Sequence, residues 1–85
     1  MTSEDCFPFL RLRVVADADP TAIARVVERF TNLNVVPRRL LAEFGGDDIL
    51  HIEVDVFGVS EAQLTLVAAK IAEAPSIVSA RWHRM

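Results

Sequence analysis

The 85-residue chain has nine basic and twelve acidic residues, a formal net charge of −3, and 52% hydrophobic residues. This composition is too apolar for a disordered chain, and the acidic balance disfavours nucleic acid and anionic membranes as partners. The length allows one domain whose core is only marginally large enough to hold a fold. We therefore expect a single domain that forms a homodimer or a higher oligomer.

The first residues are polar and include the single cysteine, Cys6. We expect residues 1–6 to be a disordered lead-in, and one cysteine cannot form an intrachain disulfide. The start lacks the basic and then apolar layout of a signal peptide, and no apolar run approaches the roughly 18 residues of a membrane span. These features predict a soluble cytoplasmic protein.

The first predicted element is a strand over residues 7–16, because apolar and polar side chains alternate along it. One face of this strand carries Leu10, Leu12, Val14 and Ala16, and the other carries Phe9, Arg11, Arg13 and Val15. The first face is apolar throughout, which indicates a half-buried strand.

A helix is predicted to follow, running to about residue 32. Asp19 is a favourable N-cap, and Pro20 suits the first helical position, where no N–H donor is needed. The helical spacing predicts a buried stripe made of Ile23, Val26, Val27 and Phe30. Asn34 then stands where a left-handed residue would end the helix.

The middle of the chain predicts a hairpin of two strands. Pro37 cannot donate to a sheet ladder, so the strand within residues 35–44 lies at an edge or begins late. The Gly-Gly-Asp-Asp sequence at residues 45–48 predicts the turn, and residues 49–57 alternate as the next strand. Its inward side chains are Leu50, Ile52, Val54 and Val56.

The last part of the chain predicts a second helix and a short strand. Gly58 ends the preceding strand, and Ser60 with Gln63 forms a capping box. The buried stripe of this helix is Leu64, Val67, Ala68 and Ile71. Pro75 follows the helix, and residues 77–83 form a last strand. The inward residues of that strand are predicted to be Val78, Ala80 and Trp82.

The element order is βαββαβ, which predicts an α+β, ferredoxin-like sandwich. Its four-stranded antiparallel sheet has the order 4-1-3-2, and two helices cover one face. In this sheet the outward side chains of the first and third strands face one another. They bring Arg11 and Arg13 toward Glu53 and Asp55, with Arg39 and His51 alongside.

Two interpretations of this outer face stay open. Opposite charges on neighbouring strands are common on solvated faces and contribute only about 0.2–1 kcal/mol per pair. The alternative is a surface for a partner protein, with apolar side chains among the charges. The candidate interface residues are Phe9, Leu41, Ile49 and Phe57.

A rim of aspartates is predicted where two turns meet at one end of the sheet. Its members are Asp17, Asp19, Asp47 and Asp48. Capping and turn formation account for aspartates at such positions, and a bound ammonium group or cation is the alternative. We expect no metal site, because His51 and His83 are far apart in sequence and no ligand motif is present.

Other functions of this architecture need residues that the chain lacks. RNA-recognition domains stack bases on aromatic side chains of the third strand, where this chain has His51, Glu53 and Asp55. Metallochaperones need a CxxC motif, and acylphosphatase-like catalysis needs an arginine in a glycine-rich phosphate cradle. No nucleophile, base and orienting residue can be assembled either, so we expect no catalytic residues.

Two stretches carry a family resemblance. Leu-Arg-Leu-Arg-Val-Val-Ala at residues 10–16 leads into Asp-Pro-Thr-Ala-Ile-Ala-Arg-Val-Val at residues 19–27, and residues 50–56 read Leu-His-Ile-Glu-Val-Asp-Val. With the length and the element order, they resemble ACT domains, most closely the short regulatory subunits of acetolactate synthase (acetohydroxyacid synthase). The resemblance spans roughly residues 10–80.

The resemblance implies a non-catalytic domain without a cofactor, which pairs side by side. It implies either binding of a small amino acid, such as a branched-chain one, near the first strand-to-helix turn or activation of a catalytic enzyme subunit. The implied ligand-binding residues are Asp19, Pro20, Thr21, Ala22 and Ile23, with Asn34 and Val36 after the helix. The alternative is a homodimeric protein-interaction module without a small-molecule ligand.

The chain departs from the family pattern at two places. The family's turn often reads Asp/Asn-x-Pro-Gly, and Thr21 stands at the glycine position. The family's Gly-aromatic-Asn-Ile segment after the first helix reads Asn-Val-Val-Pro at residues 34–37.

Overall fold

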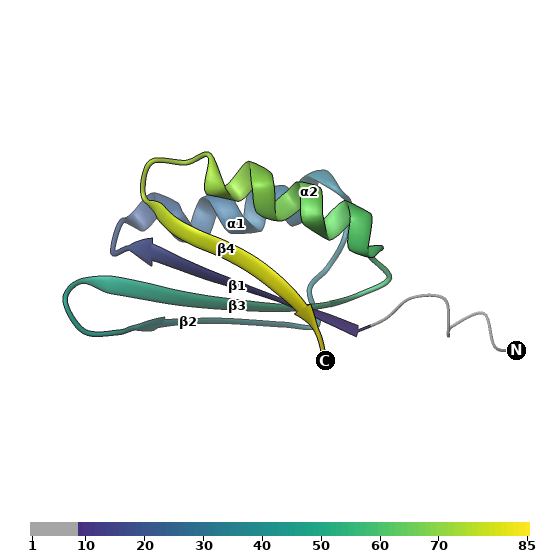
Figure 1. Cartoon of the computed structure of the whole chain (residues 1–85), viewed down its shortest axis with the longest axis horizontal. Helices are drawn as coiled ribbons and strands as arrows, with labels where there is room; N and C mark the ends of the chain where they lie inside the picture. Colours follow the sequence, from purple (N-terminus) through teal and green to yellow (C-terminus); the bar gives the residue numbers. More distant parts are fainter. Residues whose placement is uncertain (1–8) are drawn as a thin grey trace, which may run out of the picture.

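The computed structural model describes residues 9–85. Along the chain they form β1 (Phe9–Asp17), α1 (Pro20–Asn32), β2 (Arg39–Phe44), β3 (Ile49–Phe57), α2 (Glu61–Ala72) and β4 (Ile77–Arg84) (Figure 1). The predicted lead-in with Cys6, and the predicted strand start at residue 7, lie outside the described residues.

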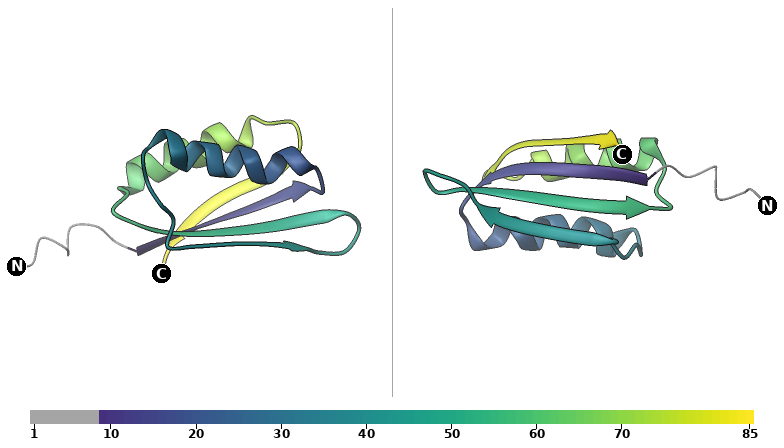
Figure 2. Two further views of the ribbon diagram at one scale, coloured as in Figure 1. Left: turned by 180° about the vertical axis from the view of Figure 1, so that it is seen from behind. Right: turned by 90° about the horizontal axis from the view of Figure 1, so that it is seen from below.

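The four strands form one antiparallel sheet in the order β2-β3-β1-β4. This is the predicted order read from the opposite edge. Both helices lie on the same face of the sheet, and the view from below shows that no other element of residues 9–85 covers the second face (Figure 2). The predicted ferredoxin-like fold is confirmed, and we call the uncovered face the open face.

The core lies between the sheet and the helices and follows the alternation of the two central strands. All predicted inward residues of β1 and β3 are buried, as is the predicted stripe of α2. Burial of apolar surface contributes about 25 cal/mol for each Å² and is the main favourable term in folding. This shared apolar layer therefore fixes the register of β1 against β3.

Helix α1 begins as predicted but turns a different stripe toward the core. Its buried residues are Ala22, Val26 and Phe30, whereas Ile23 and Val27 are 36% and 42% exposed. The predicted stripe was therefore wrong at those two positions. Each lies one residue, or 100°, beyond a buried one, and α1 covers the outer part of the sheet, so its flank faces solvent.

The connection from α1 to β2 and the following hairpin match the turn chemistry of the sequence. Asn34 has φ 59°, the left-handed conformation predicted for it, and Asp47 and Asp48 have φ 59° and 58° in the hairpin turn. Strand β2 begins only after Pro37, at Arg39, and forms an edge of the sheet.

Strand β4 contains a register shift that changes its inward residues. Val15 lies opposite Ser79, but Ala16 lies opposite Ile77, so Val78 has no partner position in β1. As a result Ile77, Ala80 and Trp82 pack against the core while Val78 is 63% exposed. The prediction that Val78 points inward was wrong because an extra residue at a bulge reverses the alternation beyond it.

Helix α2 has the predicted capping box. The Ser60 Oγ accepts from the backbone N–H of Gln63 at 3.1 Å, and the Gln63 Oε1 accepts from the backbone N–H of Ser60 at 3.0 Å. The indole Nε1 of Trp82 on β4 donates to the Oγ1 of Thr65 on α2 at 3.0 Å. Neither helix within residues 9–85 is long and apolar enough to cross a membrane.

Candidate functional site

The turn between β1 and α1 is held by its own side chains. The Asp19 Oδ1 accepts hydrogen bonds from the backbone N–H and the hydroxyl of Thr21, both at 2.9 Å. The hydrogen bond from the backbone N–H of Thr21 is the main cause that lowers the pKa of Asp19 below its usual value. Asp19 is therefore engaged as the N-cap of α1.

The other ligand candidates at this turn differ in access. Pro20 and Thr21 are exposed and Ile23 is 36% exposed, but the side chain of Ala22 is fully buried in the core. Within one chain only the exposed residues of this group can present side chains to a ligand.

The candidates after the helix lie at its opposite end. Helix α1 has 13 residues, and at 1.5 Å per residue it separates Asn34 and Val36 from the turn by about 20 Å. Val36 is 86% exposed. One chain therefore does not bring the two predicted groups of ligand residues together (Figure 1).

The predicted rim of aspartates forms where the β1–α1 turn meets the hairpin. The backbone N–H of Ala18 donates to the carbonyl of Asp48 at 2.9 Å, which joins the two turns directly. Across residues 9–85, however, the structure contains no group of three or more His, Cys, Asp or Glu side chains placed to hold a metal ion.

The open face is centred on an ion-pair network between β1, β2 and β3. The Arg11 Nε and Nη2 donate to the two carboxylate oxygens of Asp55 at 2.7 and 3.0 Å. The Arg39 Nη1 reaches both acidic residues, at 3.0 Å from Glu53 Oε1 and 3.4 Å from Asp55 Oδ2. Arg13 adds a contact of 3.4 Å to Glu53.

This network stabilises the ionised forms of its acids. The hydrogen bonds from Arg11 are the main cause that lowers the pKa of Asp55, and the hydrogen bond from Arg39 does the same for the pKa of Glu53. Asp55 is only 4% exposed although it lies on the uncovered side of the sheet. The arginine side chains already shield it from water.

Aromatic residues lie at one end of the open face. The Phe9 and Phe57 rings meet edge to face with their centroids 6.2 Å apart, and the Arg38 guanidinium carbon lies 5.4 Å from the Phe57 centroid. Both rings stay partly exposed, at 41% and 37%. An exposed aromatic pair beside an arginine has the composition typical of interface centres.

The four predicted interface residues do not form one patch. Phe9 lies opposite Phe57, whereas Leu41 lies opposite Glu53 near the β2 edge. Ile49 is eight positions along β3 from Phe57, or about 26 Å at 3.3 Å per residue. The open face is therefore a long strip with apolar side chains at both ends and charges in the middle.

Sequence reasoning missed three features. It did not predict that Asp55 is shielded from water, and it left out Arg38, whose place beside Phe57 depends on where β2 begins. It also missed a cleft of about 320 Å³ between the helices, lined by Arg25, Arg29 and Lys70 among others. The four-residue spacing of the two arginines was the available signal, because it places both on one face of a helix.

Comparisons with known proteins give structural matches without sequence matches. No protein-family model and no curated protein matches the sequence. The C-terminal domain of the MgtC protein from Mycobacterium tuberculosis superposes with a TM-score of 0.77 at 19% identity, over 93% of this chain and 88% of that one. The ACT domain from GTP pyrophosphokinase of Chlorobium tepidum gives a TM-score of 0.75 at 12% identity, over 91% of this chain and 99% of that one.

An enzyme also shares the fold. An acylphosphatase from Coxiella burnetii superposes with a TM-score of 0.64 at 9% identity, over 100% of this chain and 88% of that one. The β1–α1 turn of the present chain has neither arginine nor glycine, the residues expected for a phosphate cradle. At these identities the likenesses establish the fold, which is ACT-like.

Proposed function

We propose that this chain is a non-catalytic, ACT-type regulatory domain that acts through protein contacts on an amino-acid biosynthetic enzyme in the cytoplasm. The acetolactate synthase catalytic subunit is the proposed target, on the basis of the sequence resemblance. The observation that carries the proposal is the open face, an uncovered side of the sheet in which a neutralised charge network is flanked by exposed aromatic rings.

The chemistry of the open face supports a protein partner. Covering a charge with another surface costs free energy because water is removed from it. Asp55 is only 4% exposed behind the arginines of its own chain, so a partner that covers this carboxylate removes little further water from it. Phe9 and Phe57 offer apolar surface beside it, and such a face suits burial better than isolated charges do.

Pairing of two copies is part of the proposal. The open face carries both cations and anions, so a second copy related by a twofold axis can place its arginines near the first copy's acids. The domain is also short for a self-sufficient core. A pair of domains would then be the unit that a catalytic subunit recognises.

Substitutions on the two faces of the sheet test this proposal. Phe57→Asp and Leu41→Asp put a charge on the open face, while Phe44→Asp is a matched control, because Phe44 lies on the helix side and is 76% exposed. We expect sedimentation velocity to show a wild-type dimer that binds the catalytic subunit encoded in the same genome. Only the open-face variants should lose either association.

Two results would count against the proposal. A wild-type monomer at micromolar concentration that binds no catalytic subunit removes it altogether. Equal losses in the Phe44→Asp variant and the open-face variants would show that the open face is not the contact surface.

A pairing module without a small ligand is the second candidate. It is favoured by the N-cap role of Asp19, by Thr21 at the family's glycine position, and by the separation of the turn from Asn34. Amino-acid binding would need a pairing that brings the α1–β2 connection of one copy to the turn of another.

Calorimetric titration with valine, leucine, isoleucine and other amino acids tests whether the regulatory domain also senses a small amino acid. Heat of binding at millimolar ligand, with a higher melting temperature, supports a sensing role, because a ligand that binds only the folded state stabilises it. In that case Thr21→Gly should bind at least as tightly. No response from either protein discards the sensing role and leaves regulation through protein contacts standing.

A further inference from the structure

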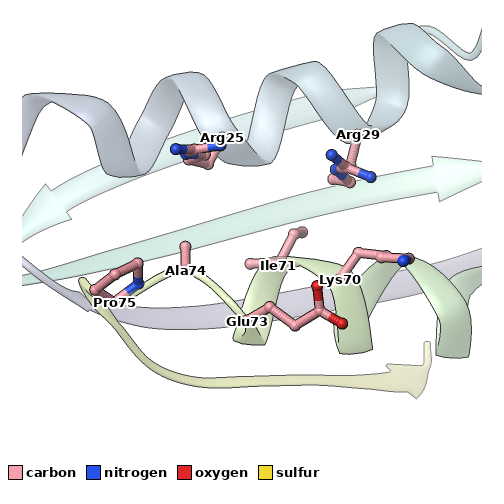
Figure 3. Close-up of a pocket in the computed structure, with 7 residues that line it drawn as sticks. All are labelled: Arg25, Arg29, Lys70, Ile71, Glu73, Ala74 and Pro75. Atoms are coloured by element: carbon pink, nitrogen blue, oxygen red, sulfur yellow. The ribbon is translucent and has the colours of Figure 1, made fainter.

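A cleft runs between the two helices on the side of the molecule away from the open face. Arg25 and Arg29 of α1 line one wall, and the end of α2 with the following turn lines the other (Figure 3). The second wall consists of Lys70, Ile71, Glu73, Ala74 and Pro75. With a volume of about 320 Å³, this basic cleft has room for a small molecule.

The charges in the basic cleft are not balanced by the part of the chain that the structure describes. The cleft contains three cationic side chains and a single carboxylate, that of Glu73. Within residues 9–85, the ion pairs involve Arg11, Arg13, Arg39 and Arg84, and none involves Arg25, Arg29 or Lys70. Like charges on neighbouring helical positions destabilise a fold, so this arrangement favours a bound anion.

The two arginines are well placed to hold one anionic group. They are four residues apart and therefore lie on the same face of α1, and Figure 3 shows them facing the end of α2 from successive turns. A guanidinium group offers parallel N–H donors that match a carboxylate or a phosphate.

An apolar cleft continues from the basic one. It has a volume of about 160 Å³, and Leu33, Leu66 and Val67 line it together with Asn32 and Gln63. Arg29 and Lys70 line both clefts and join them. Leu66 is 66% exposed although it is apolar, and it precedes Lys70 by about one helical turn, or about 6 Å.

We propose that the joined clefts bind a small organic anion with a hydrocarbon group. A carboxylate or phosphate head lies against Arg25, Arg29 and Lys70, and the hydrocarbon group lies along α2 against Leu33, Leu66 and Val67. This site goes beyond the proposed regulatory function and lies on the other side of the sheet from the pairing surface, so it stands whether or not the open face pairs.

Calorimetric titrations of the full chain test the site with four probes: inorganic phosphate, hexyl phosphate, hexanoate and hexanol. Hexyl phosphate and hexanoate, called the hexyl anions below, should both bind more tightly than inorganic phosphate. Hexanol should bind most weakly because it has no charge. The difference between hexyl phosphate and hexanoate identifies the preferred head group. Binding should weaken as the salt concentration rises.

Two sets of variants test the contributions of the anionic head and of the hydrocarbon group to binding. Arg25→Gln and Arg29→Gln should each raise the Kd for both hexyl anions about tenfold, whereas Arg25→Lys should retain part of the affinity. Leu66→Asn should weaken the binding of the hexyl anions toward the affinity of inorganic phosphate. It should leave the affinity for inorganic phosphate unchanged. Arg81→Gln, which removes an exposed arginine that lines neither cleft, is the charge-matched control.

The proposal is overturned if neither hexyl anion binds at millimolar concentration, or if hexanol binds as tightly as they do. Equal effects of Arg81→Gln and Arg25→Gln would also overturn it, because they would show nonspecific attraction to positive charge. Arg25 and Leu66 are exposed, so circular dichroism and thermal unfolding should show that their variants keep the fold.

Discussion

Arg11 on β1 donates two parallel hydrogen bonds to the carboxylate of Asp55 on β3, 44 positions later in the chain. The sheet aligns these two residues directly opposite one another. Their contact joins the central strands on the side where no helix covers them, and Asp55 is 4% exposed there. The pair therefore links the stability of the sheet to the chemistry of the open face.

Removing either partner of this pair should lower the free energy of unfolding. Asp55→Ala should cost about 1.5–3 kcal/mol, because it removes hydrogen bonds between charged groups. Arg11→Met should cost more, since it leaves a buried carboxylate with only the 3.4 Å contact from Arg39. Urea unfolding measures both. Arg13→Met is the control, because that side chain is 57% exposed and such pairs contribute little.

The pH dependence of stability should follow from the same network. Hydrogen bonds from Arg11 lower the pKa of Asp55 in the folded state, and one from Arg39 lowers that of Glu53. A lowered folded-state pKa adds stability that is complete above the unfolded pKa, about 4, and is lost as the pH falls through the folded pKa. The protein should thus be less stable at pH 3 than at pH 7.

An Asp55→Asn variant isolates this pH effect. Its stability should fall less between pH 7 and pH 3 than that of the wild type, because one carboxylate no longer binds a proton on unfolding. Urea unfolding at the two pH values gives the comparison. If Glu28→Gln, which removes a carboxylate from α1, reduces the pH dependence equally, the network is not its source.

Substitutions of two glycines should differ in their effect on stability, although neither position has a neighbour within 4 Å of an added Cβ. Gly58 has φ +88°, so Gly58→Ala should destabilise the protein by about 1–2 kcal/mol. Gly46→Ala should change the free energy of unfolding by no more than about 0.5 kcal/mol. Thermal and urea unfolding measure the difference, and equal effects would contradict the assigned backbone conformation at Gly58.

The register shift in β4 makes a prediction about adjacent residues. Val78→Lys should be nearly neutral because Val78 is 63% exposed, whereas Ile77→Lys should cost about 2 kcal/mol by placing a charge against the core. A strand without the bulge would give the reverse order. Unfolding curves of the two variants therefore decide which residue faces inward.

The open face was only partly predictable. The alternation of β1 and β3 is enough to place Arg11 and Arg13 beside the acidic residues of β3. It could not show that Asp55 is shielded from water, because that depends on the side-chain rotamers of Arg11 and Arg39 on two different strands. The Arg38–Phe57 contact likewise depends on where β2 begins.

The element order, the caps of both helices and the inward faces of β1 and β3 follow from the sequence alone. These features depend on local chemistry and on apolar periods that each segment carries within itself. Tertiary contacts determine which flank of α1 meets solvent, which residue of β4 follows the bulge, and where the basic cleft forms. Those outcomes depend on segments far apart in the chain. The strand-to-helix turn has one feature of each kind. Its cap at Asp19 is local, but its distance from Asn34 is set by the course of α1.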